Sequence, residues 1–179
     1  MPSLQNFVHS FQKDIARSNR FEVIILPPSG LPLVAAYGRN LTLRCENAQL
    51  PGRTLATTEQ RTYGPIEKFP YLTTYNDLDL TFIVDDDMSQ KYVFDTWFEY
   101  INPSSTNNIG YKSEYSCDLL INQYDVSNRL SYSVNVIGAY PMSMNQLDLD
   151  WSSDGYHKLA VTFAYTRWEQ NTSYFVVWF

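Results

Sequence analysis

The sequence has few of the residues on which most enzyme active sites depend. Among its 179 residues are two histidines, His9 and His157, and seven glycines. His9 falls in a predicted helix and His157 at the start of a predicted strand, so the chain has too few histidines to favour a histidine-based metal site or a Ser-His-Asp triad. The glycines form no Walker loop, GxGxxG or GxSxG sequence. We therefore expect no catalytic residue, no metal and no cofactor.

Cysteines and long apolar runs are also scarce. Cys45 and Cys117 are the two cysteines, and they show no CxxC spacing, so we expect two buried free thiols. No stretch approaches the roughly 20 apolar residues of a membrane helix, and the first residues lack the apolar run of a signal peptide. We expect a protein folded in a reducing compartment, with no membrane partner.

Basic charge is in deficit. The chain has 13 basic and 19 acidic residues and a formal net charge of -6. Affinity for nucleic acid comes largely from Lys and Arg, so this balance excludes a strong nucleic-acid binder but permits a protein that stands near DNA without holding it. The composition is 44% hydrophobic and 16% aromatic, which is typical of a globular, strand-rich chain.

Hydrophobic periodicity predicts a mostly β fold. Val93, Trp97 and Ile101 form a helical stripe that we expect to face the helix's own core. A short N-terminal helix is predicted for residues 3–16, and the proline-rich segment 27–40 is predicted as a loop. Period-two alternation predicts about seven strands, at residues 20–26, 41–47, 77–84, 115–122, 130–140, 146–151 and 158–168.

No βαβ rhythm, internal repeat or linker interrupts these elements. We therefore predict one antiparallel β-sandwich or barrel with one external α-helix and the short N-terminal helix. The domain is expected to span residues 1–169. Residues 170–179 form an apolar C-terminal extension, whose aromatic side chains must be covered in water. Its expected contact residues are Phe175, Trp178 and Phe179.

Carboxylate clusters are the best argument for an enzyme or a cation site. Residues 85–87 are three consecutive aspartates, which hard cations favour, but they sit where a helix is expected to begin, and Asp87 with Gln90 fits a capping box. Asp148 and Asp150 lie two apart, as do Asp77 and Asp79. Such pairs serve glycosidases, but a solvated strand face also requires polar residues, and we favour that interpretation.

Six motifs, taken in order, resemble one protein family. They are RSNRFEV at 17–23, CENAQLPG at 45–52, FDTWFEYI at 94–101, QYD at 123–125, AYPMSMNQLDLDW at 139–151 and VTFAYTRWE at 161–169. The ordered set resembles the tail tube proteins of contractile-tailed bacteriophages.

The resemblance implies hexameric rings in which subunits join into one continuous β-barrel around a channel. The rings stack into a tube inside a sheath, bounded by baseplate and tail-terminator proteins, through which genomic DNA passes without specific binding. It implies a location in the virion after assembly in the host cytoplasm, with the helix around Trp97 outside and Asp77 and Asp79 facing the lumen. A baseplate tube-initiating or tube-end paralogue, and a type VI secretion-like tube protein, are alternatives.

The tyrosine-rich segment 57–82 then becomes a candidate contact between rings. Gly64 and Pro65 are predicted as the tip of an extended arm, and Pro70 as a stop on strand pairing. Alternatives are a surface loop packed on its own domain, or a binding module for single strands or sugars, for which basic residues are few. The candidate contact residues carry charges of both signs, which fix register: Arg61, Tyr63, Glu67, Lys68, Phe69 and Tyr71.

Overall fold

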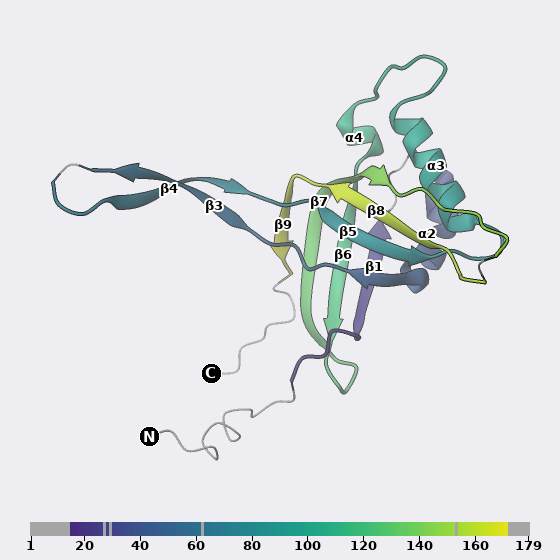
Figure 1. Cartoon of the computed structure of the whole chain (residues 1–179), viewed down its shortest axis with the longest axis horizontal. Coiled ribbons are helices and arrows are strands. Elements are labelled where there is room, and N and C mark those ends of the chain that lie inside the picture. The colour runs from purple at the N-terminus through teal and green to yellow at the C-terminus, as the bar shows by residue number, and fades with distance from the viewer. Residues whose placement is uncertain (1–14, 27, 29, 62, 153, 172–179) are drawn as a thin grey trace.

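The computed structural model describes residues 15–26, 28, 30–61, 63–152 and 154–171, and it is built mainly of antiparallel strands (Figure 1). The prediction of a mostly β, antiparallel fold is confirmed. The described elements are β1 (Phe21–Leu26), α2 (Pro32–Arg44), β2 (Cys45–Ala48), β3 (Thr54–Gln60), β4 (Glu67–Thr74), β5 (Leu78–Ile83), α3 (Ser89–Ile101), α4 (Lys112–Tyr115), β6 (Cys117–Tyr124), β7 (Leu130–Met144), β8 (Lys158–Ala164) and β9 (Arg167–Gln170).

Strand β7 belongs to two sheets. Its first part pairs with β6 and β9, and its last residues pair with β8. Near the change of partner lies Gly138, with a φ of 65°, a conformation that favours glycine. Ala139, which follows it, is the last residue to pair with β6. A Cβ at Gly138 would stand 2.9 Å from Thr166 Oγ1, and the Gly138 amide donates to Asp118 Oδ1 at 3.0 Å. Gly138 therefore lies next to the point where the strand leaves one sheet for the other.

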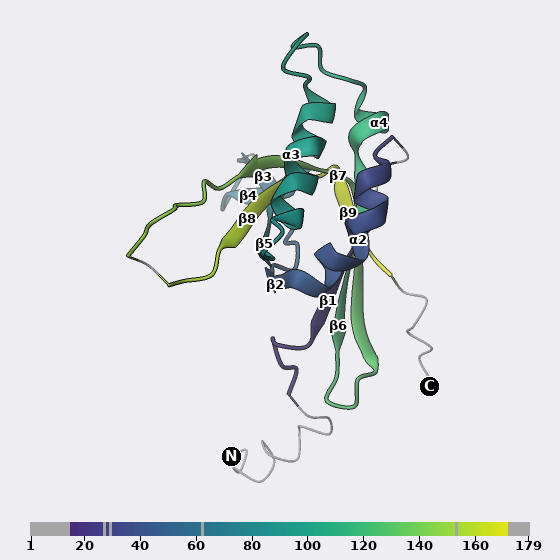
Figure 2. The same ribbon diagram turned by 90° about the vertical axis from the view of Figure 1, so that its right-hand side faces the viewer.

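The strand order is β1-β6-β7-β8-β5-β2, with β9 beside β7. The first sheet contains β1, β6, β7 and β9, and the second contains β7, β8, β5 and β2. Figure 1 shows the strands of the second sheet crossing those of the first at a large angle. Figure 2 shows α2 and α3 side by side, and both lie on the side of the domain away from the β3–β4 hairpin.

The core lies between the two sheets and the helices α2 and α3, and its aromatic part lies between the second sheet and α3. Alternate residues of β5 and β8 are buried, as period two requires. Phe82 and Phe163 meet Phe94 of α3, with ring centroids 5.3 Å and 6.1 Å away. Trp97 packs edge-on against Phe163 at 6.1 Å, and its Nε1 donates to the Tyr115 carbonyl at 2.9 Å. Aromatic pairs at these separations add to the free energy of burial.

The stripe predicted on the central helix packs as expected. Val93 and Trp97 are fully buried, and Ile101 is partly buried against the same core. In this structure the stripe therefore faces the core of its own subunit.

Helix α2 corrects two predictions. Residues 32–44 are helical, where a loop over 27–40 and a strand from 41 were predicted, and the strand begins at Cys45. Pro32 stands in the first turn, which its fixed φ suits. Leu41 is buried and Leu43 is 71% exposed, because residues two apart point to different sides of a helix. A five-residue alternation was too short to separate the two periodicities.

The start of α3 is stabilised differently from the predicted capping box. The N-cap is Met88, in the left-handed region, without a side-chain cap. Gln90 and Asp85 bind each other twice: Asp85 N donates to Gln90 Oε1 at 2.9 Å, and Gln90 Nε2 donates to Asp85 Oδ2 at 2.7 Å. Asp87 Oδ1 accepts from Ser89 N at 3.1 Å. Arg44, at the end of α2, pairs with Asp85 at 2.7 Å, so Asp85 links the end of α2 to the start of α3.

Several predictions fall at the ends of the chain. The N-terminal helix predicted at 3–16 lies mostly outside the described residues, and Ile15 and Ala16 are not helical. Phe175, Trp178 and Phe179 also lie outside the described residues, so their contacts stay a prediction, as does the domain span 1–169. In the described part of the chain, no helix is long and apolar enough to cross a membrane.

We expect Trp97→Ala to lower the free energy of unfolding by about 3–5 kcal/mol, because it opens a cavity among rings that are fully buried. Tyr92→Ala, on the exposed side of the same helix, is the matched control and is expected to cost less than about 1 kcal/mol. Urea denaturation of both variants at one low protein concentration measures the difference. Equal losses for the two variants would contradict the packing described above.

Candidate assembly surfaces

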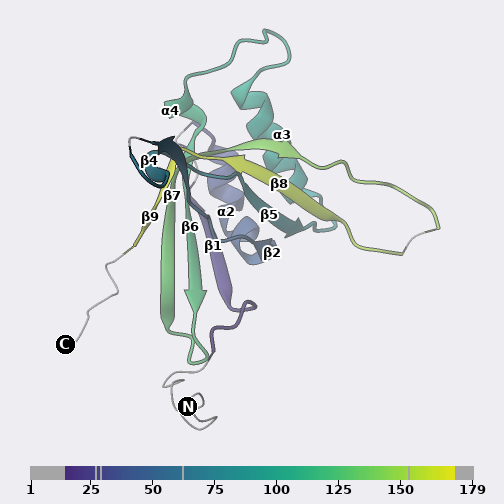
Figure 3. The same ribbon diagram turned by 60° about the vertical axis from the view of Figure 1, so that its left-hand side comes forward.

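The β3–β4 hairpin projects from the domain as a two-stranded arm (Figures 1 and 3). Its strands pair with each other and form a sheet of their own. All eight residues of β4 are exposed. The alternative of a surface loop packed on its own domain is therefore wrong, and the predicted extended arm is confirmed. Gly64, with a φ of 93°, lies in the turn at its tip.

Pro70 does not stop the pairing of this arm. It lies inside β4 opposite Thr57, where the register shifts between Ala56 and Thr57. Proline lacks an amide hydrogen, and within sheets it is confined to edges, strand starts and bulges. The predicted stop is corrected to an irregularity within a continuous hairpin.

The six predicted contact residues all lie on this arm, from Arg61, directly after β3, to Tyr71 within β4. Tyr63 is 97% exposed, and Phe69 and Tyr71 are exposed as well. Lys68 faces Glu59 across the hairpin at 3.6 Å. Among the described residues no ion pair involves Arg61 or Glu67. The arm thus carries aromatic surface and charges of both signs, and what it contacts stays a prediction.

The outer face of β5 and β8 is the second candidate surface, because it points away from α3. Its side chains are small: Asp79 is opposite Thr162, and Thr81 is opposite Ala160. Thr162 Oγ1 donates to Asp79 Oδ1 at 2.7 Å. Asp77 is exposed just before β5. The face is therefore smooth, polar and acidic at one end.

A cation on the same sheet is neutralised. Lys158 lies opposite Ile83, and its Nζ pairs with Glu46 Oε1 at 2.8 Å. The pKa of Lys158 is raised, first by this side-chain hydrogen bond and then by one with Tyr156. The lysine keeps its proton and its charge is matched, so the face gains no positive patch.

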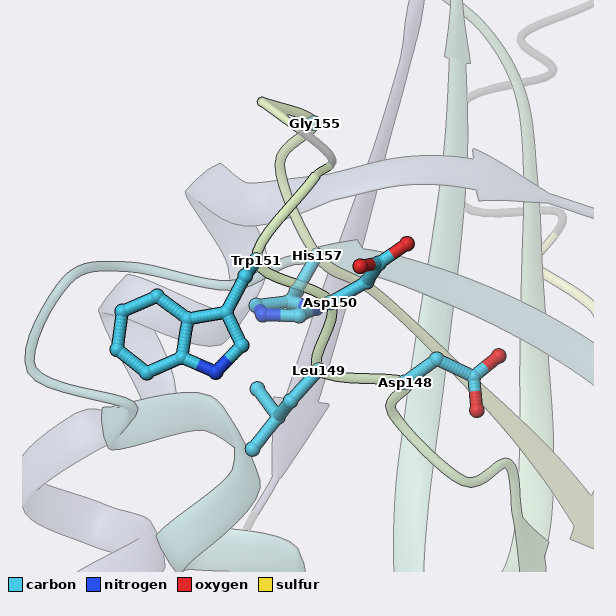
Figure 4. Close-up of a pocket in the computed structure, with 6 residues that line it drawn as sticks. All are labelled: Asp148, Leu149, Asp150, Trp151, Gly155 and His157. Carbon is cyan, nitrogen blue, oxygen red and sulfur yellow. The ribbon is translucent and has the colours of Figure 1, made fainter.

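The loop between β7 and β8 is the third candidate surface, and it corrects the strand predicted at 146–151. Residues 145–157 form no strand in the described structure. The loop surrounds a pocket of about 310 Å³, shown in Figure 4. The pocket is lined by Asp148, Leu149, Asp150, Trp151, Gly155 and His157.

This pocket does not have the features of a carboxylate active site. Asp150 is fully exposed, and its pKa is lowered by hydrogen bonds from the Ser152 amide and hydroxyl, both at 2.9 Å. A glycosidase acid requires a raised pKa. Figure 4 shows the Asp148 and Asp150 carboxylates apart and turned away from the Trp151 ring. In the described part of the chain, no three His, Cys, Asp or Glu side chains are grouped to hold a metal ion.

Both cysteines are free, as predicted. Cys117 is buried, and Cys45 is only partly buried. Burial raises the pKa of the Cys45 thiol to about 12, against a smaller lowering effect of the Asn47 backbone. Burial also raises the pKa of Cys117, with a further contribution from Asp118. Neither thiol has the lowered pKa of a reactive cysteine.

Comparison with known proteins gives one family and several similar folds. Residues 16–171 match the model of a family described as phage tail tube protein. No curated protein matches the chain in sequence. A solved chain from the sheath/tube terminator of the PVC extracellular contractile injection system, in its extended state, is 17% identical with a TM-score of 0.62, over 89% of this chain and 98% of that one.

Two further solved structures have a similar fold. A chain from the PVC sheath-tube complex is 16% identical with a TM-score of 0.63, over 91% of this chain and 95% of that one. A chain from the baseplate of the anti-feeding prophage is 17% identical with a TM-score of 0.63, over 89% of this chain and 97% of that one. At these identities the likeness shows a shared fold.

We expect Cys45 to resist thiol reagents in the native state near about pH 8, because only the thiolate reacts and its pKa is raised to about 12. Reaction is expected as the pH approaches that value or when the chain unfolds. Since the pKa of Cys45 in the folded chain lies above the ordinary thiol value of 9.0, the stability that depends on the protonated thiol is complete below about pH 9 and is lost as the pH rises toward 12.

The measurement is thiol labelling of native and denatured protein. The variant Tyr63→Cys, with an exposed cysteine at the hairpin tip, is the reactive control. Native Cys45 that labels as fast as the control would contradict the described burial.

Proposed function

Because the chain belongs to the phage tail tube protein family, we propose that it is a structural subunit of the inner tube of a contractile tail, without catalysis. The observation that carries the proposal is the exposed β3–β4 arm. A two-stranded hairpin alone is marginally stable in water, and this one exposes every residue of β4. An arm of this length, with aromatic and charged side chains along it, requires a partner surface, and neighbouring copies supply it.

Open sheet edges support assembly into a ring. The order of the strands leaves β1 and β2 as the two ends of the path. Unpaired edges template association with other chains unless they are covered. Pairing between neighbouring subunits closes the sheets into a composite barrel, and we propose six subunits per ring from the family resemblance.

The outer face of β5 and β8 then forms the channel wall, with α3 on the outside of the ring. Thr81, Ala160 and Thr162 give a smooth polar wall, and Asp79 adds negative charge. DNA carries a dense negative charge, which such a wall repels. Genomic DNA therefore passes through the channel without specific binding. Asp77, at the rim of the channel, also repels the DNA phosphates.

The outer surface of the ring, including the exposed side of α3, meets a sheath, and the ends of the tube meet baseplate and terminator proteins. We place the chain in the tube proper, within the virion and after assembly in the host cytoplasm. The similar solved chains come from a sheath-tube complex, a terminator and a baseplate, so a tube-initiating or tube-end role is the alternative.

The first test is assembly of the purified chain. We expect rings, and tubes at high concentration, in negative-stain images and in sedimentation. A chain that stays monomeric at high concentration would overturn the proposed function.

The second test addresses the hairpin. Reversing Arg61 and Lys68 to Glu is expected to leave rings intact and to reduce the tube fraction at least about tenfold, because like charges then meet at the contact. The double reversal of Arg39 and Lys91 to Glu, on α2 and α3, is the charge-matched control and is expected to leave stacking unchanged. If the hairpin variant forms normal tubes, Arg61 and Lys68 are not part of the contact between rings.

The third test addresses the wall. Asp79→Lys tubes are expected to bind single-stranded oligonucleotide in a salt-sensitive manner, because each ring gains a circle of positive charge facing the lumen. Glu114→Lys, on α4, adds the same charge elsewhere and is expected to leave binding weak. Equal binding by the two variants, measured at one low salt concentration, would place Asp79 outside the channel.

A further inference from the structure

The β7–β8 loop exposes two large apolar side chains that its own subunit does not use. Leu149 is 87% exposed and Trp151 is completely exposed. Figure 4 shows both on one side of the loop, while the carboxylates of Asp148 and Asp150 point to the other. Tryptophan is usually well covered in a folded chain, and it is enriched among the residues that dominate binding energy at interfaces.

The base of this loop is firmly held. Asn145 N donates to the Ala160 carbonyl at 3.0 Å, and Ala160 N donates back to Asn145 Oδ1 at 2.7 Å. Asn145 Nδ2 also donates to the Lys158 carbonyl at 3.2 Å. Nearer the apex, Asp150 accepts two hydrogen bonds from Ser152. Because these bonds hold the base of the loop and the turn after Asp150 before any contact, less conformational entropy is lost when Trp151 docks.

The loop and the hairpin lie at opposite ends of the same strands. Ile83 pairs with Lys158 beside the loop, and Leu78 pairs with Phe163 where the chain arrives from the hairpin. Figures 1 and 3 show the two features projecting on opposite sides of the domain. Strands in a closed barrel run from one rim to the other, tilted from its axis. In stacked rings of one direction, the loop of one ring therefore faces the hairpin of the next.

The two features also complement each other in charge and shape. Residues 148–154 contain three aspartates and no Lys or Arg, while residues 61–68 contain Arg61, Lys68 and one acid. Tyr63 projects at the hairpin tip, and the loop offers a pocket of about 310 Å³ beside Trp151. A pocket of this size accommodates a large side chain.

We propose that the loop at residues 145–157 is the receiving surface for the β3–β4 hairpin tip of a second copy of this chain in the adjacent ring. Leu149 and Trp151 supply the apolar contact, and the negative charge of the loop attracts Arg61 and Lys68. The inference rests on the proposed function and names the partner of the hairpin. It makes Trp151 a determinant of stacking.

The first experiment removes the apolar contact in the full chain. Leu149→Ala with Trp151→Ala is expected to leave rings intact and to raise the protein concentration needed for tubes by roughly tenfold or more, as for a central interface residue. Tyr111→Ala removes an aromatic side chain of comparable exposure, 79%, from another segment and is the matched control. Ring content by sedimentation and tube content by negative stain are measured together.

The second experiment tests the pairing itself. A chain with Tyr63→Cys and Trp151→Cys is expected to give a ladder of disulfide-linked oligomers when its tubes are oxidised. A chain with Tyr63→Cys and Tyr111→Cys is expected to give none above the level of each single variant. The native cysteines are free, with Cys117 buried and Cys45 partly buried, and the parent chain gives the background.

The outcomes separate the inference from the proposed function. A parent chain without rings overturns both. Parent tubes together with normal tubes from the alanine variant and no specific ladder overturn this inference alone. Tubes that form normally without Trp151 but lose binding to a sheath protein would assign the loop to the sheath, and would overturn it as well. Loss of stacking with a Tyr63–Trp151 ladder supports it.

Discussion

The passage of β7 from one sheet to the other is the constraint on which the rest of the fold depends. The strand pairs with β6 up to Ala139, just after Gly138, and with β8 from Tyr140 onward, so both sheets share one continuous backbone. Gly138 is required there by its positive φ and by the closeness of Thr166. Because the strand is shared, the second sheet is held against the first, and its inner face is fixed over the helices.

Burial on one face of the second sheet frees the other face for assembly. Phe82 and Phe163 face α3, so Asp79, three residues before Phe82, and Thr162, next to Phe163, must face outward. The alternation of side chains along each strand thus gives the sheet one face in the core and one face in water. A one-residue shift in register would exchange them, and the aromatic cluster around Trp97 opposes that shift.

The sequence predicted those parts of the molecule in which one periodicity runs for long enough. The strands at β5, β6, β7 and β8 and the stripe of Val93 and Trp97 follow from alternation and helical spacing alone. The structure of residues 32–47 was not predicted in this way. The spacing of Leu41, Leu43 and Cys45 fits a short strand, but the same spacing also arises by chance in a helix. In the folded chain, contacts of this segment with β1 and α3 favour the helix over a strand.

The candidate surfaces were predicted unevenly for a similar reason. The extended arm followed from the turn residues at Gly64 and Pro65, but Pro70 was misjudged because a bulge accommodates it. The alternation of Leu147, Leu149 and Trp151 with acids predicts a strand at residues 146–151, which in the structure lie within the loop at 145–157. The alternation is real, but no strand pairs with it. The signal that favoured a loop was the run SSDG directly after Trp151.

The hairpin and the loop differ from each other and lie at opposite ends of the same strands, so the two ends of the subunit are not equivalent. The hairpin carries both signs of charge, with Lys68 close to Glu59, so it discriminates weakly by charge alone. The loop carries acids only over residues 148–154. Two loops placed against each other would bring like charges together at a cost, whereas hairpin against loop does not. Such unlike surfaces make a heterologous contact, which extends without closing when the copies stack along an axis. The acidic loop would therefore supply the polarity of the tube, because it penalises the reversed ring.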